Sequence, residues 1–168
     1  NFKSFQIDTD HVRVVDGVSS GVAPIFVDPT GQNRIYVVKG ANDRLLPADV
    51  DLAADDLKQA DCIILQFEIP LETVYYTIRF ARANGIKCIL NPAPGQPVDL
   101  SEVSRVDYFI PNESEAETIS GKPVRTVEEA KDCARYFLER GVPRVIITLG
   151  VRGALLAANG SFDLIPAY

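Results

Sequence analysis

The sequence predicts an α/β protein with a mostly parallel sheet and flanking helices, preceded by a small separate layer of β-strands. Four apolar runs show no strict alternation with polar residues, which is typical of strands buried on both faces of a parallel sheet. Helical stretches lie between several of these runs, and alternating strands and helices indicate βαβ units. The four runs are residues 62–67, 86–90, 106–110 and 145–149.

Short strands are expected before any helix. Residues 12–15 alternate, and residues 21–27 and 34–38 have the composition of strands. The intervening residues 28–33 form a turn cluster rich in Asp, Pro, Gly and Asn. Pro24 lies inside the second strand and favours an edge position, because proline has no N–H to give to a neighbouring strand. This segment therefore predicts a separate hairpin layer.

Two helices are expected from apolar spacing. The first has an apolar stripe on one face, along which the stem of Arg82 would lie. The second begins with a capping-box pair, Thr126 and Glu129, and Gly141 stands where a C-terminal cap is expected. The first stripe consists of Leu71, Val74, Tyr75 and Ile78, and the second of Ala130, Ala134, Phe137 and Leu138.

The last segment predicts a hairpin. Residues 154–158 and 161–165 are strand-like and are separated by Asn159 and Gly160. A two-residue Asn-Gly connection is a strong signal for a tight hairpin turn.

Composition limits the possible functions. The 168 residues fit one ordinary domain, with 46% hydrophobic and 24% charged residues. Seventeen basic against 23 acidic residues give a net charge of −6, which argues against a nucleic-acid partner. No apolar run approaches the roughly 20 residues of a membrane helix, so no membrane partner is expected. The N-terminus also lacks the layout of a signal peptide.

The three cysteines, Cys62, Cys88 and Cys133, lie in apolar patterns without C-x-x-C spacing. This pattern predicts reduced thiols in a cytoplasmic protein and argues against a zinc site or a disulfide. Methionine is absent and the chain begins at Asn1, while its other end follows directly on a strand-like run. We therefore expect both ends to be cuts through a larger protein.

Polar residues and glycines follow each of the four apolar runs. Glu68 comes after the first run, residues 91–95 after the second, residues 111–115 after the third and residues 150–153 after the fourth. Ligands of parallel sheets bind beyond the carboxyl ends of the strands. This edge could therefore hold a polyol, a metal ion and phosphate groups.

Each of these features also has a purely structural explanation. Glu68 would suit the N-terminal dipole of the next helix. Asn112 and Glu115 have the spacing of a helix cap and its partner. Residues 91–94 are compatible with a rigid turn, and Gly150 and Gly153 with a strand exit.

Two other classes of site are not expected. The single histidine, His11, is not near a nucleophile motif, so a Ser/His/Asp arrangement is absent. The sequence contains no G-x-x-x-x-G-K-[ST] loop, which argues against a P-loop nucleotidase.

Taken together and in order, five segments resemble the ribokinase/PfkB family of carbohydrate kinases. The N-E-x-E-A-E and T-L-G-x-x-G pieces are the most specific of them, and the set spans most of the chain. The segments are S-G-V-A-P-I-F-V at 20–27, L-Q-F-E-I-P at 65–70, N-P-A-P at 91–94, P-N-E-S-E-A-E at 111–117 and T-L-G-V-R-G at 148–153.

The resemblance implies a ribokinase-like α/β sandwich with a small β lid over a sugar site. Residues 1–40 would belong to the lid and its adjoining strands, and residues 41–168 to the nucleotide- and sugar-binding domain. Ala23 and Ile25 would line the sugar pocket from the lid, and Glu68 matches a sugar-contacting glutamate. The lid would also form the contact of a homodimer.

The resemblance further implies ATP and Mg²⁺ as cofactors, with a monovalent cation possible in the full-length parent. Asn112 matches an asparagine of the nucleotide-phosphate site. Glu115 completes the N-x-x-E motif that acts on magnesium, through water. The nucleotide-binding loop and following strand would supply Thr148, Gly150, Val151, Arg152, Gly153, Ala154 and Leu155.

The implied activity is ATP-dependent phosphorylation of a pentose, D-ribose to ribose 5-phosphate. The alternatives are a kinase for deoxyribose, fructose or adenosine, or a non-catalytic regulator that binds a sugar or nucleotide. The expected partners are thus small molecules.

Some family segments are missing from the sequence. It contains no G-A-G-D segment, which supplies the catalytic aspartate and an anion hole in the family, and no N-terminal G-G-x-N region. An early sugar-binding aspartate is also absent. The resemblance therefore covers roughly the middle half of a family-sized chain, and these residues alone are expected to be inactive.

Overall fold

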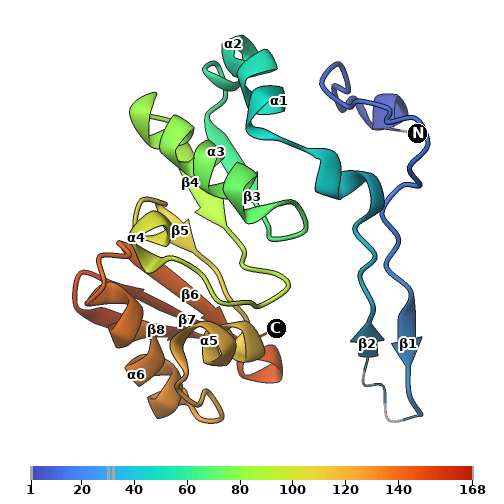
Figure 1. Ribbon diagram of the computed structural model, residues 1–168. Helices are drawn as coiled ribbons and strands as arrows, with labels where there is room; N and C mark the ends of the chain where they lie inside the picture. The colour runs from blue at the N-terminus through green and yellow to red at the C-terminus, as the bar shows by residue number, and fades with distance from the viewer. Residues whose placement is uncertain (1, 30, 32, 168) are drawn as a thin grey trace.

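The computed structural model describes residues 2–29, 31 and 33–167. Within them, one sheet has six strands arranged in chain order (Figure 1). The pairings from β3 to β6 are parallel and those from β6 to β8 are antiparallel, which confirms the predicted mostly parallel α/β fold. The strands are β3 (Cys62–Leu65), β4 (Lys87–Leu90), β5 (Tyr108–Phe109), β6 (Arg144–Thr148), β7 (Ala154–Ala158) and β8 (Ser161–Ile165).

Helices connect the parallel strands. Both helices expected from apolar spacing are present: α3 (Leu71–Ala83) buries Val74 and Ile78, and α6 (Val127–Leu138) begins with the predicted capping box. The other helical segments are α1 (Pro47–Leu52), α2 (Ala54–Leu57), α4 (Leu100–Val103), α5 (Glu113–Ser120), and the 3-10 turns η1 (Phe2–Phe5), η2 (Gly40–Arg44) and η3 (Gly150–Arg152).

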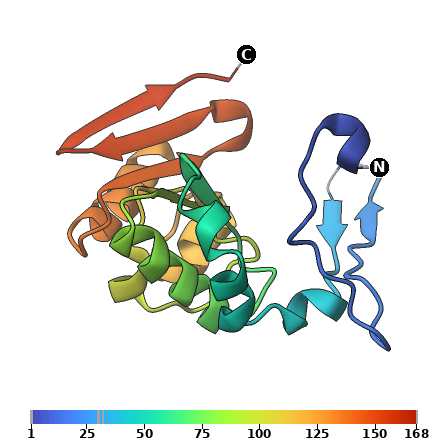
Figure 2. The ribbon, with the colours of Figure 1, turned by 90° about the horizontal axis from the view of Figure 1, so that it is seen from above.

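The sheet is covered on one face only, so the expectation that its strands are buried on both faces is wrong for the described chain. The helices lie on one side of the sheet (Figure 2). On that side Ile63 and Leu65 are buried, whereas Ile64 between them is 62% exposed. Right-handed connections between strands that pair in chain order place successive helices on the same face, which explains the arrangement.

The N-terminal hairpin is present but shorter than expected. Strand β1 (Ile25–Val27) pairs with β2 (Asn33–Ile35) in antiparallel fashion, and Val22 forms an isolated bridge with Val38. The hairpin stands apart from the sheet in both views (Figures 1 and 2). Thr30 and Gln32 of the predicted turn lie outside the described residues.

Residues 12–15 do not form the predicted strand. A strand needs a neighbour for its backbone hydrogen bonds, and this segment pairs with no strand of the described chain. Arg13 in this segment instead donates side-chain hydrogen bonds to the backbone oxygen of Arg44 at 3.0 Å and to the Asp49 carboxylate at 3.1 Å. Val14 remains 87% exposed.

The C-terminal hairpin agrees with the prediction. Strands β7 and β8 pair from Ala154 with Ile165 to Ala158 with Ser161. Asn159 and Gly160 have φ angles of 50° and 80°, which are the positive values that a tight type I′ turn requires.

The thiols of Cys62, Cys88 and Cys133 are free in the described structure. Burial raises the pKa of Cys88 to about 12 and also raises that of Cys133. Among the described residues, no helix is both long and apolar enough to cross a membrane.

Candidate functional site

The exits of the four parallel strands lie along one edge of the sheet, here called the rim. Backbone hydrogen bonds join neighbouring exits: the N–H of Phe67 donates to the oxygen of Ala93 at 2.9 Å, and that of Thr148 to Pro111 at 3.0 Å. Asn112 forms a parallel bridge with Thr148. The structure therefore brings together the exit segments from which the sequence predicted a site.

Glu68 stands on the rim just after β3. The preceding Phe67 is fully buried and anchors the exit segment, while Glu68 itself is exposed. Within the described chain its carboxylate has no hydrogen bond or ion pair. A carboxylate in this position is free to accept hydrogen bonds from a hydroxylated ligand.

Asn112 and Glu115 form a complete capping box at the start of α5. The Asn112 side-chain oxygen accepts from the Glu115 N–H at 2.8 Å, and Glu115 Oε2 accepts from the Asn112 N–H at 2.8 Å. The structural explanation for this spacing is therefore correct. The capping box leaves Oε1 of Glu115 and the side-chain nitrogen of Asn112 without a hydrogen bond among the described residues.

Gly95 brings the exit loop of β4 against Glu115. A Cβ atom on Gly95 would lie 3.0 Å from Glu115 Cα and 3.3 Å from its Cγ. Only a residue without a side chain allows the loop to pass this close without displacing Glu115. Glu115, which is 8% exposed as a residue, is therefore held by its cap on one side and by this loop on the other.

The donor set at Glu115 is compatible with magnesium. Among the described residues, no group of three or more His, Cys, Asp or Glu side chains is placed to hold a metal ion. Mg²⁺ is commonly bound by one or two carboxylates and completes its shell with water and phosphate oxygens. A single buried carboxylate on the rim fits this pattern.

A glycine turn follows β6. Gly150 has a φ of 55° and Gly153 a φ of 95°, and the Leu149 N–H closes the turn by donating to the Gly153 oxygen at 2.8 Å. Val151 at its tip is 95% exposed. The turn thus presents backbone and one apolar side chain at the rim.

Arg152, predicted to contact the nucleotide, is bound to two acceptors of the protein itself. Its guanidinium donates to the carboxylate of Glu113 and to the backbone oxygen of Arg125. The sequence analysis did not single out Glu113 as a partner of Arg152. The available signal was that one rim segment carries a basic residue, Arg152, and another carries an acidic one, Glu113. The side chain of Leu155 is fully buried in the core, so only its backbone could face a ligand.

Ala23 and Ile25 are not brought to the rim by any contact of the described chain. Both lie on the N-terminal hairpin and are exposed. Because Ile25 pairs with Ile35, the side chains of Ile25 and Ile35 lie on the same face of the hairpin.

Comparison with known proteins gives the following matches. The model of the pfkB family of carbohydrate kinases matches residues 1–168. A deoxyribokinase of Salmonella typhi is 43% identical over 169 residues, which cover all of this chain and 55% of that protein. A ribokinase of Staphylococcus aureus is 38% identical with the same coverage.

A solved structure agrees with these matches. The ribokinase of Arabidopsis thaliana complexed with ribose and ATP superimposes with a TM-score of 0.84 at 26% identity, over 95% of this chain and 52% of that one. The chain thus spans about half the length of the relatives it matches.

Proposed function

Because the chain belongs to the pfkB family of carbohydrate kinases, we propose that the protein carrying these residues transfers the γ-phosphoryl group of ATP to a pentose. The first candidate reaction is D-ribose to ribose 5-phosphate. The observation that carries the proposal is the rim, where Glu68, the Asn112–Glu115 cap and the glycine turn stand at neighbouring strand exits. These are the chemical groups needed for a hydroxylated sugar, a metal ion and a nucleotide.

Each of these rim residues would have a separate role in binding the sugar, the metal ion or the nucleotide. Glu68 would accept hydrogen bonds from sugar hydroxyls and so orient the sugar. The Asn112 amide would donate to a phosphate oxygen, and the glycine turn would leave room for the nucleotide. Magnesium held near Glu115 through water would supply positive charge against the phosphates. Phosphoryl transfer relies mainly on such positioning and charge neutralisation.

The catalytic base is proposed to lie outside these residues. The sequence has no G-A-G-D segment, which the family resemblance assigns to that role. A monovalent-cation site in the full-length protein and a cytoplasmic location are further expectations from the resemblance.

The hairpin is proposed to serve as a lid. One of its faces carries Ala23 and Ile25, which would cover the sugar. The other face holds a hollow of about 540 Å³ lined by Pro24, Phe26 and Tyr36 together with Arg34. We propose that the lid meets a second copy of the chain, because its apolar side chains are exposed on both faces. Sedimentation of the full-length protein as a monomer at micromolar concentration would contradict this.

A second candidate substrate is 2-deoxyribose, which the deoxyribokinase match favours. The test is a coupled ADP-release assay of the full-length protein with ribose, 2-deoxyribose, fructose and adenosine, beside a reaction without sugar. We expect turnover that depends on a pentose. ADP release that no sugar or nucleoside stimulates would reject the kinase, and sugar binding without turnover would favour the non-catalytic regulator.

Glu68→Ala is expected to weaken pentose binding in the full-length protein. Loss of hydrogen bonds to a charged acceptor should raise the Kd for the sugar roughly tenfold or more. The Kd for ADP should change little, because Glu68 lies at the β3 exit and the glycine turn follows β6. Titration calorimetry with each ligand measures both values. Unchanged sugar affinity together with weakened ADP binding would show that Glu68 is assigned to the wrong ligand.

A further inference from the structure

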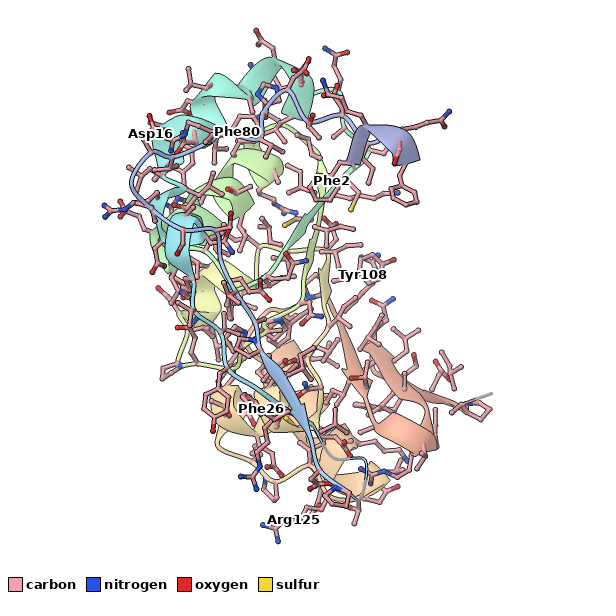
Figure 3. All side chains as sticks on the ribbon, turned by 90° about the vertical axis from the view of Figure 1, so that its right-hand side faces the viewer. Phe2, Asp16, Phe26, Phe80, Tyr108 and Arg125 are labelled. Atoms are coloured by element: carbon pink, nitrogen blue, oxygen red, sulfur yellow. The ribbon has the colours of Figure 1, made fainter. Side chains whose placement is uncertain are left out.

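Arg152 connects three segments of the chain. Its Nη2 donates to Oε1 of Glu113 in the first turn of α5, and its Nη1 donates to the backbone oxygen of Arg125, just before α6. The side chain of Arg125 extends away from the body of the molecule (Figure 3). The glycine turn is therefore tied through a single side chain to the beginnings of two helices.

The turn directs this side chain inward. Val151 and Arg152 are neighbours in η3, yet Val151 is 95% exposed whereas the Arg152 side chain is 32% exposed. The Arg152 N–H donates to the Leu149 oxygen at 3.1 Å, which fixes the backbone from which the side chain projects. Both ends of the guanidinium fork are occupied by protein acceptors.

Glu113 belongs to the same turn of helix as the predicted phosphate and magnesium residues. It directly follows Asn112 and lies two residues before Glu115. A contact between Arg152 and Glu113 therefore sets the spacing between the glycine turn and the capping box. The spacing matters because small misplacements of groups that hold a reacting phosphate can cost about 10²-fold in rate.

We propose that Arg152 is a positioning residue of the nucleotide site, an inference that rests on the proposed kinase function. It acts through Glu113 and the Arg125 carbonyl, and it holds the glycine turn at a fixed distance from Asn112 and Glu115. Arginine is required because its planar fork reaches two acceptors in different segments, which the single ammonium of lysine does not do in the same geometry. The charge-assisted bond to Glu113 gives the link its strength.

The test compares variants of the full-length protein. Arg152→Ala removes both contacts, Arg152→Lys keeps the charge, and Glu113→Gln keeps the side-chain shape but removes the charge of the acceptor. Arg79→Ala is the matched control, because it removes an ion pair with Glu102 of 2.8 Å that joins α3 to α4. The readouts are the Kd for ADP from calorimetry, the KM values for ATP and pentose, and the melting temperature.

We expect Arg152→Ala to raise the Kd for ADP and the KM for ATP roughly tenfold, the loss associated with one charge-assisted hydrogen bond. The KM for pentose should stay within about twofold, because a displaced turn affects the nucleotide side of the rim. Arg152→Lys should recover part of the ADP affinity. Glu113→Gln added to Arg152→Ala should cost little more, because both act on one contact.

The possible results distinguish failure of the positioning role of Arg152 from failure of the proposed kinase function. ADP binding in Arg152→Ala equal to that of the wild type and of Arg79→Ala would overturn the positioning role. If Arg152→Ala fails to fold, normal ADP affinity in both Arg152→Lys and Glu113→Gln would overturn it equally. A wild-type protein that binds neither ADP nor ATP would reject the proposed function, and the inference with it.

Discussion

Gly153→Ala is expected to destabilise the protein by about 3 kcal/mol or more, through backbone strain and overpacking together. Gly153 has φ 95° and ψ −136°, a conformation essentially restricted to glycine. An added Cβ would also lie 1.9 Å from the Ile165 backbone oxygen and 2.9 Å from the Ala167 nitrogen. Because both obstacles are backbone atoms, no side-chain rotation can relieve the overlap.

Gly150→Ala is the matched control for this prediction. Gly150 stands at the other end of the same turn with φ 55°, but no atom lies within 4 Å of the position that an added Cβ would take. Gly150→Ala should therefore lower the free energy of unfolding by only about 1 kcal/mol, the penalty for an alanine in the left-handed conformation. Denaturant unfolding of the full-length variants gives both values. Equal losses of stability in the two variants would show that the close approach at Ile165 contributes nothing.

Local signals explain why several elements could be predicted from the sequence. The capping box of Thr126 and Glu129 and the Asn159-Gly160 turn involve residues at most three positions apart. The backbone responds directly to such neighbours, so the sequence determines these features without knowledge of the rest of the fold. The rim was predictable for a related reason, since all parallel strands direct their carboxyl ends to one edge.

The features that sequence reasoning missed depend on distant partners. Arg152 and Glu113 are 39 residues apart, and no local pattern pairs them. Residues 12–15 have the alternation of a strand, but a strand forms only where another offers its edge. Ile64 and Tyr108 belong to runs that predicted strands buried on both faces. The helices of the described chain cover only the other face of the sheet, so Ile64 is exposed and Tyr108 (labelled in Figure 3) is half-buried.

Glu115 presents the sharpest competition between a structural and a functional role. Its Oε2 atom serves the cap of α5, whereas its position on the rim and the N-x-x-E motif favour a role toward magnesium. The structure confirms the cap. A substitution that keeps the hydrogen bond and removes the charge distinguishes the two.

Glu115→Gln is expected to lower kcat roughly 10- to 100-fold and to raise the Mg²⁺ concentration needed for half-maximal rate, as loss of an outer-shell metal partner does. The amide oxygen of glutamine can still accept from the Asn112 N–H, so the melting temperature should barely change. The measurement is an Mg²⁺ titration of the pentose-dependent rate beside a melting curve, both in the full-length protein.

Glu129→Gln supplies the control, because Glu129 occupies the same capping-box position in α6 and accepts from the Thr126 N–H at 2.9 Å. Backbone hydrogen bonds from Arg125 and Thr126 lower the pKa of Glu129, so its carboxylate is charged at neutral pH. Both substitutions therefore remove a capping charge, but only the one at Glu115 removes it from the rim. Matching magnesium responses in the two variants, with Glu115→Gln the less stable, would leave Glu115 as a helix cap alone.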